Sequence, residues 1–172
     1  MASKKDFKKF LNDLSKEELI KELEKLYSRF PPVKTFYDVD ISGDTSFLLS
    51  EAKRKIENEY FPSKGFGKGR SGEVKKIIDE FAKVSVYPKD VIELYLFRFK
   101  MAVKFTKAYG DIDEAFYTSA ENAFKKAMLL IQKNGYKEEM RENVKEIVES
   151  MGDFGWGFSD TINDFYYTYM KD

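Results

Sequence analysis

The sequence contains no cysteine and no histidine among its 172 residues. Without cysteine there are no disulfide bonds, no thiol nucleophiles and no thiolate metal ligands. Without histidine there are no imidazole zinc ligands, and every catalytic triad with an imidazole base is excluded. A hydrolase of this composition would need carboxylates with a metal ion, or a lysine or tyrosine base.

Net charge and long hydrophobic runs are also lacking. The 30 basic and 30 acidic side chains balance at pH 7, which does not favour nucleic acid as a partner. No apolar run approaches the roughly 20 residues of a membrane-spanning helix. No apolar segment follows the N-terminal residues as it would in a signal peptide. We therefore expect a cytoplasmic protein with no membrane partner.

Hydrophobic residues are nevertheless abundant enough for a folded core. They make up 42% of the sequence, and aromatic residues make up 16%, which is too apolar for a disordered chain. A chain of 172 residues is long enough for one domain. The sequence therefore predicts a single helical domain over residues 1–172.

The spacing of hydrophobic residues predicts helices almost throughout, and no segment shows the sustained alternation of a strand. Ser15 and Glu18 form a capping box before a helix that ends at Pro31. Residues 33–44 fit either a short helix or an extended segment, whereas residues 89–109 predict a central helix that is apolar on more than one side. We predict an all-α fold of about seven or eight helices in stacked antiparallel pairs, as an α-solenoid-like superhelix or a compact orthogonal bundle.

A basic, glycine-rich segment over residues 64–76 is the sharpest local feature. Glycines let backbone N–H groups converge on an anion, and the N-terminus of the following helix adds partial positive charge. An arginine can bind a phosphate through two N–H groups, and a phenylalanine can stack on a base. The spacing matches neither a Walker nor a Rossmann loop, and a flexible connector with solvated charges is the alternative. The candidate anion-binding or nucleic-acid-binding residues are Gly65, Gly67, Lys68, Arg70 and Lys75.

Three carboxylates, Asp111, Asp113 and Glu114, precede or begin another predicted helix. Oxygen ligands at this spacing can hold magnesium or calcium, although the complete calcium-loop pattern is missing. Acidic residues at a helix start are also what capping and the helix dipole favour by themselves. These three residues are the candidate metal ligands of a carboxylate–metal enzyme.

Aromatic residues are the candidate anchors for a partner. They often dominate the binding energy at protein interfaces, although a single tryptophan beside a terminal helix is most often part of the core. The residues assigned to a candidate interaction surface are Phe66, Tyr109, Trp156 and Phe158.

Four short motifs occur in order along the chain. They are Leu14-Ser15-Lys16-Glu17-Glu18-Leu19-Ile20, Gly65-Phe66-Gly67-Lys68-x-Arg70, Tyr109-Gly110-Asp111-Ile112-Asp113-Glu114-x-Phe116-Tyr117 and Gly155-Trp156-Gly157-Phe158. Together they resemble a family of small bacterial proteins catalogued as a domain of unknown function. The resemblance implies a bacterial, cytosolic, single-domain protein, and it brings no activity, ligand or catalytic residue with it.

The sequence favours a non-enzymatic protein-binding or adaptor module with a groove or concave face lined by aromatic residues and lysines. An all-helical chain without an acid–base or nucleophile set, but with many Tyr and Phe residues, supports this prediction. The expected partner is another protein, and no cofactor is predicted. The alternatives are phosphate or nucleic-acid binding through residues 64–76 and a carboxylate–metal enzyme around Asp111, Asp113 and Glu114.

Overall fold

The computed structural model describes residues 2–171, and within them every regular element is an α-helix. The nine helices of this part of the chain are α1 (Lys4–Asn12), α2 (Lys16–Arg29), α3 (Pro31–Ser42), α4 (Ser46–Tyr60), α5 (Ser71–Val84), α6 (Pro88–Tyr109), α7 (Glu114–Asn134), α8 (Lys137–Glu149) and α9 (Phe158–Met170). The all-α prediction is confirmed, with a small difference in the number of helices. The difference arises at α1, which the sequence shows only as a short apolar stripe, and at α3, which it leaves open.

Residue contacts divide the chain into two compact units, one ending at Gly43 and the other beginning at Asp44. The first unit contains α1, α2 and α3, and the second contains α4 to α9. The structure thus subdivides a chain that the sequence treats as one domain. All candidate site residues lie in the second unit.

Local sequence signals explain the helix ends of the first unit. The side chains of Ser3 and Ser15 each accept a hydrogen bond from the backbone N–H three residues later. The side chain at that later position accepts a hydrogen bond from the backbone N–H of the serine, which completes a capping box. Pro31 begins α3, where its missing N–H costs nothing, and α3 ends at Gly43 in the left-handed conformation. The prolines therefore end one helix and begin the next.

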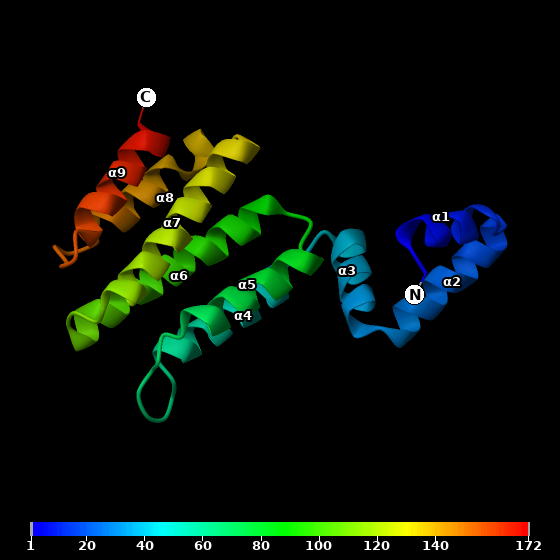
Figure 1. Cartoon of the computed structure of the whole chain (residues 1–172), viewed down its shortest axis with the longest axis horizontal. Helices are drawn as coiled ribbons and strands as arrows, with labels where there is room; N and C mark the ends of the chain where they lie inside the picture. Colours follow the sequence, from blue (N-terminus) through cyan, green and yellow to red (C-terminus); the bar gives the residue numbers. More distant parts are fainter. Residues whose placement is uncertain (1, 172) are drawn as a thin grey trace. The chain divides into compact units, whose positions relative to one another are not determined.

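The second unit is built around α6, the long helix at its centre. Helix α6 contacts α4, α5 and α7, and α7 in turn contacts α8 and α9 (Figure 1). Phe99 of α6 illustrates the packing, because its ring centre lies 4.8 Å from that of Phe124 and 5.8 Å from that of Phe158. The sequence prediction of a central helix at this position is correct.

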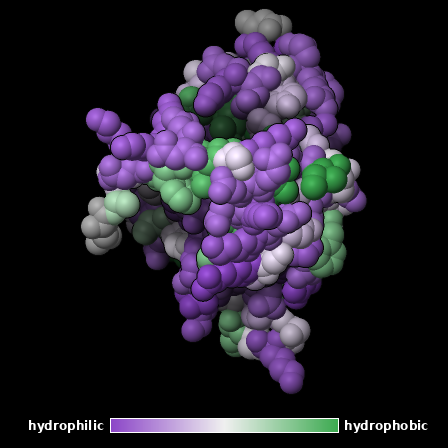
Figure 2. Space-filling view, turned by 90° about the vertical axis from the view of Figure 1, so that its right-hand side faces the viewer, coloured by the Kyte–Doolittle hydropathy of each residue, from purple (hydrophilic) through white to green (hydrophobic). Residues whose placement is uncertain are grey.

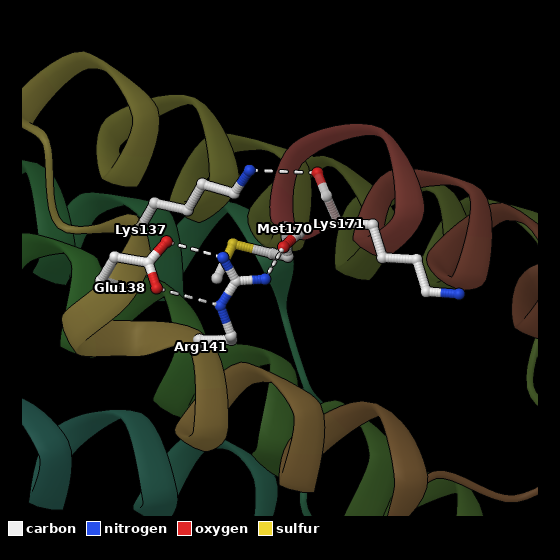
Figure 3. A network of polar contacts seen from close by, with 5 residues as sticks. All are labelled: Lys137, Glu138, Arg141, Met170 and Lys171. Atoms are coloured by element: carbon white, nitrogen blue, oxygen red, sulfur yellow. Dashed lines mark hydrogen bonds and ion pairs between the residues drawn. The ribbon is translucent and has the colours of Figure 1, made fainter.

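Two basic side chains of α8 cap the C-terminal end of α9 by donating hydrogen bonds to its carbonyl oxygens (Figure 3). Arg141 donates to the carbonyl oxygen of Met170 at 2.7 Å, and Lys137 donates to that of Lys171 at 3.0 Å. The last carbonyl groups of a helix lack partners within the helix and carry partial negative charge, so cationic donors stabilise them. Glu138 holds Arg141 in place through two hydrogen bonds.

The surface view shows a mostly hydrophilic face on which hydrophobic residues emerge in separate patches (Figure 2). None of the helices in the described part of the chain is both long and apolar enough to cross a bilayer.

Candidate functional site

The glycine-rich loop between α4 and α5 is tied to the end of α4. The backbone N–H groups of Lys68 and Gly69 donate to the carbonyl oxygen of Glu59 at 3.0 and 3.1 Å. Gly67 lies so close to Tyr60 that a Cβ atom at position 67 would stand 1.6 Å from the Tyr60 carbonyl oxygen. Only glycine allows this approach, so the loop is docked on the main chain of α4.

Arg70 continues this docking through its side chain. Its Nε and Nη2 atoms donate to the two carboxylate oxygens of Glu59 at 2.7 and 3.0 Å, and its backbone N–H donates to Oε1 at 3.2 Å. The side-chain hydrogen bond from Arg70 is the main reason why the pKa of the Glu59 carboxyl lies below its ordinary value. Charge-assisted pairs of this geometry are among the stronger surface interactions in proteins.

Several of the predicted anion-binding residues already use their donors within the protein. Gly67 and the amides of Lys68 and Gly69 face α4, and the fork of Arg70 is occupied by Glu59. Lys75 forms an ion pair with Asp79 one turn further along α5. The loop therefore does not present a converging set of free N–H groups, although Gly65 and the Lys68 side chain remain exposed.

Two of the predicted aromatic anchors meet beside this loop. Phe66 is 82% exposed, and its ring centre lies 6.4 Å from that of Tyr109 at the end of α6. Tyr109 also stacks on Phe61 at 6.2 Å. We call Phe61, Phe66 and Tyr109 the loop aromatic surface.

The other two predicted anchors have different environments. Trp156 is exposed in the turn before α9 and has a φ of +62°, which non-glycine residues rarely adopt. Phe158 is buried, with its ring centre 4.9 Å from that of Tyr117, and it belongs to the hydrophobic core. Phe158 is therefore not accessible to a partner, whereas Trp156 is.

Two of the three predicted metal ligands, Asp111 and Asp113, accept hydrogen bonds from nearby residues of the same segment. Asp113 caps α7 by accepting a hydrogen bond from the Phe116 backbone N–H at 2.8 Å. Asp111 accepts from the hydroxyl of Tyr117 at 2.6 Å, while Glu114 begins α7. Over the residues that the structure describes, no group of three or more acidic side chains is placed to share a metal ion.

Sequence reasoning missed Glu59, the residue that organises the loop. Glu59 lies eleven positions before its partner Arg70, on the other side of the glycine-rich segment. A pair closed by a loop has no periodic signal, unlike pairs three or four residues apart on one helix. The only available clue is a carboxylate at the end of the helix that precedes a basic loop.

Comparison with known proteins places the chain in a family. A family of unknown function, DUF6155, matches residues 2–169, which is nearly the whole chain. No match was found among curated proteins or among solved structures. The chain therefore belongs to the family of unknown function DUF6155.

Proposed function

We propose that the protein is a cytoplasmic, non-enzymatic binding protein that recognises another protein through the loop aromatic surface. The main support for this proposal is that the Phe66 side chain is 82% exposed although its loop is hydrogen-bonded to α4. Burying an exposed aromatic ring at an interface is favourable. A loop that is already docked loses less conformational freedom on binding than a mobile one, so more of that gain becomes affinity.

The charges around the loop aromatic surface suggest the chemistry of the partner. Lys64 and Lys68 flank Phe66 in the sequence, and neither forms an ion pair with another described residue. Lys104 lies with its Nζ atom 4.8 Å from the centre of the Phe61 ring and 3.7 Å from a carboxylate oxygen of Glu57, so its charge is already paired. A partner with an apolar pocket for Phe66 and a rim of Asp or Glu side chains would complement this surface.

The same contacts favour a protein over nucleic acid as the partner. Arg70, the side chain best suited to bind a phosphate, is held by Glu59, and the backbone N–H groups of Lys68 and Gly69 donate to α4. Nucleic-acid affinity comes largely from several phosphate contacts, and a chain of zero net charge gains no general attraction. Phosphate or nucleic-acid binding through residues 64–76 is therefore the weaker alternative.

Site-specific photocrosslinking tests the proposal. A benzophenone amino acid replaces Phe66 in one preparation and Phe47, which is 75% exposed on α4, in another. Each preparation is irradiated in a nuclease-treated lysate of the organism that encodes the protein. We expect position 66 alone to give a defined adduct with one protein.

Affinity measurements with the purified crosslinked protein then decide the outcome. We expect Phe66→Ala to weaken binding at least tenfold, because an anchor ring of this kind contributes about 2 kcal/mol, and Lys68→Glu to weaken it as well. Phe47→Ala is the matched control and should bind as the wild type does. Equal affinity of Phe66→Ala and wild type, or crosslinking to nucleic acid alone, would contradict the proposal.

A further inference from the structure

A cleft of about 900 Å³ lies in the second unit, outside the loop aromatic surface. Its walls come from the beginning of α5 and from α7, and Tyr95 and Arg98 of α6 lie between them. Both α5 and α7 contact α6. Small-molecule sites in proteins have about this volume.

Arg98 is a buried cation in this cleft. Its side chain lines the cleft although the residue is only 6% exposed. Nη2 donates to the hydroxyl of Ser119 and, at 3.4 Å, to the carbonyl oxygen of the same residue. Among the described residues, Nε of Arg98 is the only buried side-chain nitrogen or oxygen atom without a hydrogen-bond partner, and no carboxylate forms an ion pair with the guanidinium.

A buried guanidinium without a carboxylate partner destabilises the fold when no anionic ligand is bound. Removing a guanidinium from water is strongly unfavourable unless an opposite charge compensates for it. The neighbouring phenols provide no such charge, since burial raises the pKa values of Tyr60 and Tyr95 above their ordinary values and keeps both protonated at neutral pH. Buried polar groups left unsatisfied in a native protein are often the groups that bind a missing partner.

Further donors converge on the same space. Ser71 and Gly72, the first two residues of α5, line the cleft, and in the described chain their backbone N–H groups donate to no protein acceptor. The N-terminus of a helix carries partial positive charge and suits an anion. The cleft is lined by three basic side chains, those of Lys75, Arg98 and Lys126, and by two acidic ones, those of Asp79 and Glu114. Asp79 is paired with Lys75, whereas Lys126 of α7 forms no ion pair with a described residue.

We propose that this cleft binds the phosphate group of a small phosphorylated ligand, with Arg98 as its principal counter-ion. Phosphate fits better than a carboxylate because it carries more charge and more acceptor oxygens, and donors reach the cleft from three helices. Arg98, Lys126 and the α5 amides provide N–H donors, and Ser119 adds a hydroxyl beside the guanidinium. The remaining volume accommodates the organic part of the ligand.

Binding of inorganic phosphate, measured by calorimetry at constant ionic strength, tests the site. We expect Arg98→Met to weaken phosphate binding at least tenfold, while Arg54→Met retains the wild-type affinity. Arg54 is an exposed arginine that is paired with Glu51 on α4, outside the cleft. Acetate at the same concentration should bind more weakly than phosphate.

Thermal unfolding without phosphate separates a binding role from a structural one. If the role of Arg98 is to bind a ligand, Arg98→Met should unfold at the same temperature as the wild type or at a higher one. The reason is that an apolar side chain has replaced an uncompensated buried charge. A markedly lower unfolding temperature of Arg98→Met would identify Arg98 as a structural residue and overturn the proposal.

Two neighbouring lysines of α7 give a second test that does not disturb the core. Lys126→Ala should weaken phosphate binding several-fold with an unchanged unfolding temperature. Lys125→Ala is the matched control, because Lys125 is also exposed but lies over the Phe165 ring at 5.3 Å. Absent phosphate binding by the wild type, equal loss in both lysine variants, or acetate binding as tight as phosphate would each overturn the proposal.

Discussion

Gly67 lies directly against the main chain of Tyr60, at the point where α4 ends. A Cβ atom at position 67 would stand 1.6 Å from the carbonyl oxygen and 2.3 Å from the carbonyl carbon of Tyr60. Because both partners are backbone atoms, no side-chain rotation can relieve such an overlap. The two residues therefore determine how the loop that carries Phe66 is placed.

Gly67→Ala should displace the loop from α4. The displacement would break the hydrogen bonds from Lys68 and Gly69 to Glu59, so we expect a loss of about 1–3 kcal/mol in the free energy of unfolding. Urea denaturation measures this difference. Gly72→Ala is the matched control, since no atom lies within 4 Å of its added Cβ and the position is helical. Equal stability of Gly67→Ala and wild type would contradict the docked arrangement.

The ion pair between Glu59 and Arg70 predicts a pH-dependent contribution to stability. Arg70 lowers the pKa of Glu59 from its ordinary value of 4.5, so folding favours the ionised carboxylate. The contribution is then complete above that ordinary value and is lost as the pH falls through the lower pKa of the folded state. Glu59→Gln should therefore cost about 1–2 kcal/mol at pH 7 and progressively less at acid pH.

A second ion pair provides the control for this prediction. Glu51 and Arg54 are three residues apart on α4 and are more exposed than Glu59 and Arg70. Glu51→Gln should change the free energy of unfolding much less than Glu59→Gln does, because solvent screens exposed pairs. Unfolding curves between pH 3 and pH 7 give both differences. If the loss in the free energy of unfolding caused by Glu59→Gln did not depend on pH, the ion pair with Arg70 would not be the source of that loss.

Helical periodicity and capping signals are sufficient to predict the fold class. The capping box at Ser15 and the prolines after α2 are local features, and the structure has them as predicted. The sequence leaves α3 open because its apolar residues do not gather on one face and its start depends on Pro31, which also marks the end of a helix. Local signals of this kind do not reveal the division at Gly43, which follows from contacts between helices.

The candidate sites are harder to predict because they depend on pairs distant in sequence. Glu59 and Arg70 meet only because Gly67 allows the loop to fold back on Tyr60. Arg98 stands within an apolar helix, and the sequence shows neither its burial nor its contact with Ser119 on α7. A charged residue inside an otherwise apolar helix pattern is the one signal that could have identified it.

Asp113 distinguishes helix capping from metal binding in the acidic segment. Its carboxylate accepts a hydrogen bond from the backbone N–H of Phe116, so Asp113→Ala should lower the free energy of unfolding by about 1 kcal/mol. Asp113→Asn should retain most of the wild-type stability, because asparagine caps helices as well as aspartate does. Denaturant unfolding with and without magnesium measures both effects. Stabilisation of the wild type by magnesium, lost equally in the alanine and asparagine variants, would instead support a metal site.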